Sequence, residues 1–244
     1  MMRDVLTVMW KEWRDMPILR GGLKGGIVGQ VIFIGILGVF LPYTTGREFV
    51  TSGMTVFIAA WGPFVMTMSL SADAFAGERE RHTLESLLAS RLSDRAIMFG
   101  KIGTIVCYAW GLTILMLLLG LATVNIVHGH GKLLMYPTAI AIGSPLIALL
   151  ISTLLSSLGV IVSLKAATVR QAAQTLSLIF VLVILVPMLG MVLPKAWIAR
   201  LWNWVGRVGL SGVIATVVGV LFILDVVVLA IAAAKFKRSR LILE

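Results

Sequence analysis

Long apolar runs, separated by short charged intervals, dominate the pattern of this chain. Six runs of 18 or more nearly uncharged residues occur, at residues 25–43, 51–72, 102–126, 137–164, 176–193 and 210–234. About 20 residues rising 1.5 Å each cross a hydrocarbon core roughly 30 Å thick. The runs lack the polar/apolar alternation of barrel strands, and helices satisfy their own backbone hydrogen bonds in lipid. The pattern therefore predicts an all-α membrane protein with six transmembrane helices in a single domain, residues 1–244.

An amphipathic pattern occupies residues 1–24, ahead of the first run. Apolar residues recur at steps of three and four from Met2 to Met16, and Trp13 is among them, whereas Lys11 and Asp15 fall on the opposite side. Such a segment predicts an interfacial helix on the surface of the bilayer. It serves either as a simple anchor of the N-terminus or as part of the frame of a docking surface.

The longest charged interval, residues 73–101, lies between the second and third runs. A cluster of alternating acidic and basic residues at 78–81 is followed by Thr83, Leu84 and Glu85, then by Leu87 and Leu88. This order predicts a helix-forming loop that presents charged surface, with leucines able to seat in a cleft of a partner.

A second short amphipathic segment, residues 194–209, precedes the last run. Tryptophans at 197 and 204 alternate with basic residues, so the segment is too short and too charged to span a bilayer. We expect it to lie outside the cell, either as an anchor at the membrane interface or as a re-entrant element above the transport pathway.

Composition and charge agree with a multi-pass membrane protein. Hydrophobic residues make up 59% of the chain and charged residues 13%, against about 25% charged residues in soluble domains. Sixteen of the 21 lysines and arginines fall on the side that holds both termini and residues 73–101, so the positive-inside rule places that side in the cytoplasm. This asymmetry, with attraction to anionic membrane lipids, accounts for the net charge of +10 without a nucleic-acid partner.

Signatures of catalysis are missing from the sequence. There is no His-Glu-x-x-His, no Gly-x-Ser-x-Gly and no phosphate-binding loop, since Gly100-Lys101 is followed by Ile102. We therefore expect no enzyme activity and no ATP hydrolysis by this chain itself. His128 and His130 lack a third metal ligand nearby, so we expect a polar turn there and no metal site.

Asp225 is the one ionisable residue well inside a predicted span. A carboxylate at the centre of a membrane helix costs roughly 2.5–3.5 kcal/mol and usually faces a partner or a cavity. Its charge is compensated by a hydroxyl such as that of Ser152, Thr153, Ser156 or Ser157, by a neighbouring subunit, by water, or by protonation of Asp225 itself. It serves in a structural hydrogen bond or in the passage of cargo or ions, or else it faces lipid without a role. An ion-coupled secondary transporter or channel would carry several such residues, so this single one favours an ATP-driven permease.

The segments Phe75-Ala76-Gly77-Glu78-Arg79-Glu80 and Thr83-Leu84-Glu85, followed by Leu87-Leu88 and Gly100-Lys101, resemble the cytoplasmic loop of ATP-binding-cassette type 2 (ABC-2) permeases. His82 stands where the family usually has glycine. The resemblance implies a coupling helix within residues 73–101 that contacts an ATPase. The interface that it implies consists of Phe75, Gly77, Glu78, Arg79, Glu80, Arg81, Thr83, Leu84, Glu85, Leu87 and Leu88.

The same resemblance implies a permease subunit of an ATP-driven exporter in a cell membrane, the inner or plasma membrane of a prokaryote. Such a permease pairs with a second copy or a related permease and binds two ATPase subunits. ATP and Mg²⁺ would bind those partners, and this chain would need no cofactor. Permeases with different cargoes share the motif, so it predicts the superfamily and no particular substrate.

Overall fold

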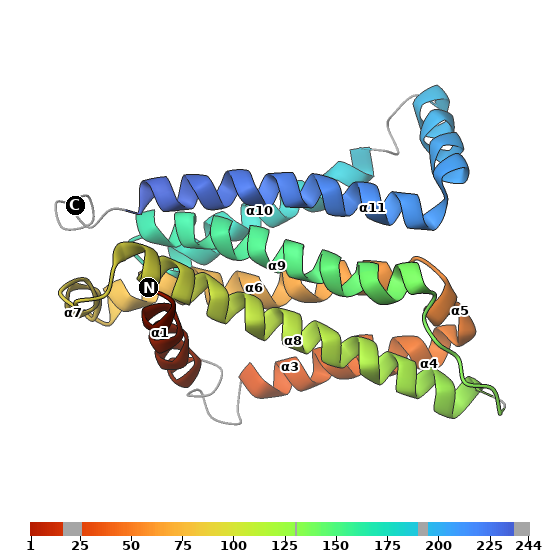
Figure 1. Ribbon diagram of the computed structural model, residues 1–244, viewed down its shortest axis with the longest axis horizontal. Helices are drawn as coiled ribbons and strands as arrows, with labels where there is room; N and C mark the ends of the chain where they lie inside the picture. The colour runs from red at the N-terminus through yellow and green to blue at the C-terminus, as the bar shows by residue number, and fades with distance from the viewer. Residues whose placement is uncertain (17–25, 130, 190–194, 237–244) are drawn as a thin grey trace.

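The computed structural model describes residues 1–16, 26–129, 131–189 and 195–236 (Figure 1). Within these residues the secondary structure is entirely helical, which confirms the predicted all-α class. The elements are α1 (Met2–Asp15), α3 (Gly26–Gly35), the π-helical η1 (Ile36–Phe40), α4 (Leu41–Thr45), α5 (Arg47–Thr51), α6 (Met54–Glu80), α7 (Leu84–Leu88), α8 (Asp94–His128), α9 (Thr138–Lys165), α10 (Val169–Leu189) and α11 (Lys195–Lys235).

Five helical stretches in the described part of the chain are long and apolar enough to cross a membrane. They are Ile27–Thr45, Met54–Glu80, Asp94–His128, Thr138–Lys165 and Asn203–Lys235. The protein is therefore a membrane protein with several apolar helices. The other predicted span, residues 176–193, overlaps α10 as far as Leu189 and otherwise lies outside the described residues, so a sixth crossing stays a prediction.

Two helices extend well beyond the apolar runs that predicted them. α6 continues from the predicted end at residue 72 to Glu80, and α8 begins at Asp94 rather than at residue 102. The Ser93 hydroxyl starts α8 by accepting a hydrogen bond from the Ala96 amide at 3.3 Å. Hydropathy marks only the lipid-buried part of a helix, so most of the predicted loop 73–101 consists of helix ends.

α6 and α9 form the centre of the bundle. Their backbones approach so closely that a Cβ atom on Gly159 would lie 2.1 Å from the Ser71 Cβ. The Ser163 hydroxyl of α9 accepts hydrogen bonds from the Phe75 and Ala76 amides, both at 2.9 Å, and donates to the Ala72 carbonyl at 3.0 Å. α9 and α6 are thereby held in a fixed register at the end where α6 meets α7.

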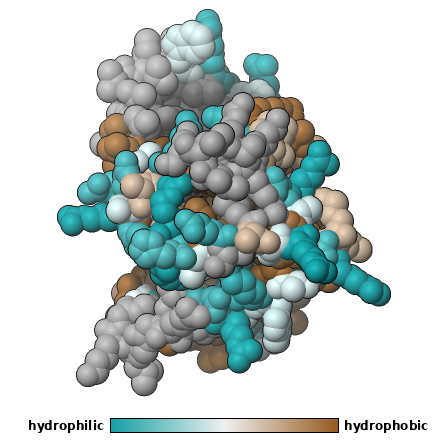
Figure 2. Space-filling view, turned by 90° about the vertical axis from the view of Figure 1, so that its left-hand side faces the viewer, coloured by the Kyte–Doolittle hydropathy of each residue, from teal (hydrophilic) through white to brown (hydrophobic). Residues whose placement is uncertain are grey.

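α8 and α11 lie on opposite sides of α9, and α3, η1 and α4 pack along α8 (Figure 1). α1 and α7 lie at one end of the bundle and α5 lies at the other. The surface at the end of the bundle that holds α1 and α7 carries many hydrophilic side chains (Figure 2). We call this end of the bundle the α7 end and the opposite one the α5 end.

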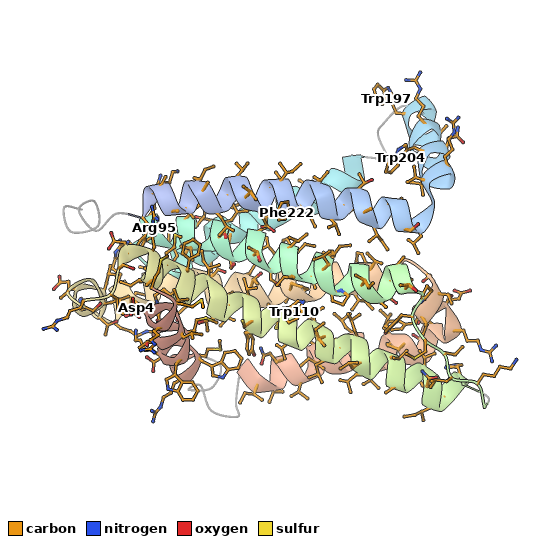
Figure 3. The ribbon with its side chains drawn as sticks, viewed as in Figure 1. Asp4, Arg95, Trp110, Trp197, Trp204 and Phe222 are labelled. Carbon is orange, nitrogen blue, oxygen red and sulfur yellow. The ribbon has the colours of Figure 1, made fainter. Side chains whose placement is uncertain are left out.

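α11 is divided at Gly209, whose φ of 69° and ψ of 174° are not helical. Gly tolerates this conformation because it has no Cβ. The part before Gly209 carries Trp197 and Trp204 and stands away from the bundle at the α5 end (Figure 3). Residues 195–209 of the predicted segment 194–209 thus form a separate helical arm, whose membrane position stays a prediction, and residue 194 lies outside the described residues.

Candidate functional site: a charged junction at the α7 end

Three consecutive residues at the end of α6 each bind a different part of the chain. The side chain of Glu78 is only 11% exposed. Its carboxylate accepts hydrogen bonds from Lys11 Nζ at 2.8 Å and from Lys101 Nζ at 3.3 Å. The hydroxyl of Thr83 donates to its other oxygen. Glu78 therefore connects α6 to α1, to α8 and to the start of α7.

Lys101 lies at the centre of this charged group. Its side chain is 1% exposed, and Nζ lies 2.9 Å from Glu12 Oε1 and 5.1 Å from the centre of the Phe75 ring. Lys11 also pairs with Glu12, at 3.4 Å, so two lysines face two glutamates. Removing one partner of such a buried group strands a charge, which costs about 3–5 kcal/mol.

The two neighbouring carboxylates keep the Lys11 ammonium charged. Partial burial alone would lower the pKa of the Lys11 ammonium, but the hydrogen bond to Glu78 and the charges of Glu12 and Glu78 outweigh it and raise the pKa. Lys11 therefore stays protonated at physiological pH.

Arg79 and Glu80 bind the two helix ends of the α9–α10 connection. The Arg79 guanidinium donates to the Leu164 carbonyl at 3.1 Å and to the Ala166 carbonyl, in the last turn and at the C-cap of α9. Glu80 Oε1 accepts from the Val169 amide, the first residue of α10, at 2.9 Å. The positive charge of Arg79 meets the unpaired carbonyl groups at the C-terminus of α9, and the negative charge of Glu80 meets the unpaired amides at the N-terminus of α10.

The turn after α6 has the hydrogen bonds of a Schellman motif. The His82 amide donates to the Arg79 carbonyl at 3.1 Å, and the Thr83 amide donates to the Glu78 carbonyl at 2.9 Å. His82 has a φ of 57°, in the left-handed region that favours glycine. This geometry explains why glycine is usual at this position in the motif that the sequence resembles.

Gly77 leaves room for an ion pair along the same helix face. Asp73 and Arg81 stand one turn on either side of it and form a salt bridge, and this contact raises the pKa of Arg81. A Cβ on Gly77 would lie 2.1 Å from Asp73 Oδ1 and 2.6 Å from Arg81 Nη2. A side chain at this position would displace the Asp73 carboxylate or the Arg81 guanidinium from the ion pair.

α1 reaches the junction because α8 has a glycine where the two helices cross. A Cβ on Gly100 would lie 2.5 Å from the Cβ of Val8, which is 1% exposed. Nearby, Trp13 contacts Tyr108 edge-on, with ring centres 6.1 Å apart. The face of α1 that packs on α8 is centred on Val8, whereas Trp10, on the other face, is 73% exposed.

The sequence-predicted interface residues divide into a buried and an exposed group. Phe75, Gly77, Glu78, Leu84 and Leu87 are buried in this chain, the two leucines in the same apolar cluster as Phe75 and Ile102. Arg79 is half-buried. Glu80, Arg81, Thr83 and Glu85 are exposed. Leu88 ends α7, and its side chain lies outside the described part of the structure.

A cavity of about 500 Å³ opens among α1, α6, α7 and α8. The charged side chains of the junction line it, together with apolar side chains such as Leu70, Leu92 and Ile105. The junction therefore borders open space on one side, so that its parts have room to shift.

Several residues that complete this junction were not among the predicted interface residues, although Lys101 belongs to the Gly100-Lys101 pair of the motif. These are Lys11, Glu12, Asp73, Lys101 and Ser163. One signal was present for Lys101, because a lone lysine at the start of a long apolar run needs a buried partner.

Asp225 lies in the membrane-spanning part of α11, far along the chain from the junction. It is 3% exposed, and within the described residues neither carboxylate oxygen has a hydrogen-bond partner. The hydroxyls of Ser152, Thr153, Ser156 and Ser157 all bond to backbone carbonyls of α9 instead. The structure therefore does not contain the serine or threonine hydrogen bond that the sequence suggested for Asp225.

His128 lies at the α5 end. Its carbonyl accepts from Arg47 Nε at 3.4 Å, and its ring lies against Tyr43. His130 falls outside the described residues. Across those that are described, no group of three or more His, Cys, Asp or Glu side chains is placed to hold a metal ion.

Comparison with known proteins gives one family. The family model described as "ABC-2 type transporter" matches residues 3–211, which include the whole junction and most of the bundle. No curated protein matches the chain.

Proposed function

Because the chain belongs to the ABC-2 type transporter family and is a transporter permease subunit, we propose that it works in an exporter whose ATP is hydrolysed by separate subunits. ABC ATPase partners are general in this family. The finer proposal is that two ATPase subunits bind a pair of permeases, made of two copies of this chain or of this chain and a related one. ATP and Mg²⁺ bind the partners.

The observation that carries this proposal is the junction of Glu78, Arg79 and Glu80. Through these residues the end of α6 is bound to α1, α8, α9 and α10. Lys101 and Glu78 are largely buried, so separating their charges is costly, whereas Lys11 reaches the same carboxylate from the exposed side. A force applied at α7 would therefore move several membrane helices together, as transport driven from outside the bundle requires.

The exposed residues beside the junction supply the proposed contact with the ATPase. Four of these residues are exposed, namely Glu80, Arg81, Thr83 and Glu85. By contrast, Leu84 and Leu87 are buried in the apolar core and pack α7 against the bundle. ATP binding would bring the two ATPase subunits together, α7 would follow them, and the bundle would open outward. In this proposal the α7 end and both termini lie in the cytoplasm.

A charge reversal on α7 tests the proposal. Glu85→Lys leaves the junction intact and should lower copurification of a coexpressed ABC ATPase partner about tenfold, since like charges facing each other oppose binding. ATP turnover in liposomes should lose its dependence on cargo. Glu48→Lys reverses an equally exposed carboxylate at the α5 end and should leave both measurements unchanged. Normal copurification and coupled turnover with Glu85→Lys would overturn the proposal.

An ion-coupled transporter or channel without an ATPase is the second candidate function. The buried carboxylate of Asp225 within α11 is the observation that favours it. Proteoliposomes that contain this chain alone distinguish the two functions. Cargo movement driven by an ion gradient would support the second candidate, whereas movement that needs the ATPase and ATP would support the first.

A further inference from the structure

The cavity among α1, α6, α7 and α8 lies where two apolar runs of the chain end. On α6, Leu70 is still inside the second run and Asp73 is past its end. On α8, Lys101 precedes the third run and Ile105 lies inside it. α1, which packs on α8 at this end of the bundle (Figure 1), has the pattern of an interfacial helix. This position corresponds to the level of the lipid headgroups in a membrane.

The side chains that line the cavity change from apolar to charged along α6 and α8. At the membrane side the two helices contribute Leu70 and Ile105, and toward the α7 end they contribute Asp73, Glu78 and Lys101. The volume of about 500 Å³ lies in the range of small-molecule sites, roughly 300–1,000 Å³. An occupant that contacts both parts has a polar head and an apolar tail. The volume suits a lipid headgroup with the start of a chain.

Two ion pairs of the lining are exposed on their basic side. The side chains of Lys11 and Arg81 are 44% and 43% exposed. Glu12 Oε1 lies 3.4 Å from Lys11 Nζ, and Asp73 pairs with Arg81. A guanidinium has more N–H donors, and a carboxylate more acceptor sites, than one contact uses. The lining can therefore bind a phosphate and an ammonium from α1 and α6 without breaking either pair.

The balance of charge distinguishes among possible headgroups. The described residues that line the cavity include four carboxylates and three basic groups, a net charge of −1. A purely anionic headgroup is therefore disfavoured relative to one that carries both charges. A quaternary ammonium has no N–H to donate to Glu12 or Asp73, whereas a primary ammonium has several. The lining thus favours a zwitterion with a phosphate and a primary ammonium.

We propose that the cavity binds the headgroup of one membrane phospholipid of the phosphoethanolamine type. The phosphate accepts hydrogen bonds from Arg81 and Lys11, and the ammonium donates to Asp73 and Glu12. The start of an acyl chain lies against the apolar wall that includes Ile105. The bound lipid connects α1 to α6 and thereby stabilises the junction. The site needs no ATPase partner, so the proposed function can fail while the site stands.

Thermal unfolding of the purified full-length protein in detergent, with added phospholipid, tests the proposal. Phosphatidylethanolamine at about ten times its apparent Kd should raise the wild-type Tm by about 3–6 °C. Phosphatidylcholine has no N–H donor and phosphatidylglycerol is anionic, so each should raise the Tm by less. Soluble glycerophosphoethanolamine at the same concentration should have little effect, because it has no chain to bury against the apolar wall. This last arm distinguishes a membrane lipid from a soluble ligand with the same headgroup.

Two variants each remove one part of the site. Arg81→Gln removes the guanidinium that binds the phosphate and should raise the apparent Kd for phosphatidylethanolamine about tenfold. Ile105→Trp fills the apolar part of the cavity and should abolish the Tm shift, and Leu92→Trp takes its place if that variant does not fold. Arg95→Gln is the matched control, because Arg95 is exposed at the same end of the bundle and does not line the cavity.

The control variant should respond to phosphatidylethanolamine as wild type does, while the cavity variants lose the response. The proposal is overturned if phosphatidylcholine or phosphatidylglycerol raises the wild-type Tm as much as phosphatidylethanolamine does, or more. Equal effects of the soluble headgroup and the lipid would also overturn it. So would equal responses of Arg81→Gln and Arg95→Gln, which leave no role for the cavity.

Discussion

Lys101 and Lys11 contact the same two carboxylates from different environments. Both donate to Glu78 Oε1 and Glu12 Oε1, yet the Lys101 side chain is 1% exposed and that of Lys11 is 44% exposed. Water can solvate a carboxylate on the Lys11 side of the group, but not on the Lys101 side. The two residues thus offer a matched pair for measuring how much burial strengthens this ion network.

Lys101→Met should lower the free energy of unfolding by about 3 kcal/mol, because it removes the cation on the side of Glu78 that water does not reach. Lys11→Met should cost less, because Lys11 is 44% exposed and water can take its place beside Glu78. Thermal unfolding in detergent, with both variants beside wild type, measures the difference. Equal Tm values for the two variants would contradict the described burial of Lys101.

At the scale of elements, the contact between α1 and α8 depends on Gly100. Val8 approaches so closely that no side chain fits at this position, whereas Gly111, on an exposed part of the same helix, has no atom within 4 Å of its ideal Cβ. Replacing glycine by alanine should therefore disturb the α1–α8 contact at Gly100 and leave it unchanged at Gly111.

Gly100→Ala should push α1 away from α8 and cost about 1–3 kcal/mol, the usual range for overpacking. Hydrogen exchange of the amides in Met2–Asp15 should become faster. Gly111→Ala should leave exchange in α1 unchanged and be neutral or slightly stabilising, because Ala is the better helix former. If both variants show wild-type exchange in α1, the close crossing at Gly100 does not hold the helix.

At the scale of the whole molecule, the distribution of charge predicts the orientation in the membrane. The α7 end carries the junction and the exposed basic residues Arg81, Arg91 and Arg95, and the positive-inside rule places such an end in the cytoplasm. The loop after α8, which includes the exposed Lys132, lies at the opposite end of the bundle.

Cysteine labelling in intact cells checks this orientation. With Cys107, which is exposed, replaced by Ala, an impermeant maleimide should label Lys132→Cys and leave Ser90→Cys unlabelled. Both variants should react after the cells are opened, which shows that each position is accessible. Labelling of Ser90→Cys in intact cells would reverse the proposed orientation of the permease.

The sequence by itself determined the helical class, the approximate positions of five membrane spans and the family. These depend on local properties, because a run of apolar residues long enough to cross the bilayer must pair its own backbone there. The Phe75–Glu80 and Thr83–Glu85 segments also predicted that the end of α6 contacts a partner, and this stays a prediction. His82 at a position usual for glycine was visible too, although its positive φ was not.

Only the tertiary structure decided what the charged residues bind. Lys11 and Glu78 are 67 residues apart in the sequence, and Glu12 and Lys101 are 89 apart, so no local pattern can pair them. Their contact depends on how closely α1 crosses α8, which Gly100 permits. The residues predicted to form one docking surface therefore divide between a buried junction and an exposed face, because burial depends on the helices that pack around a residue.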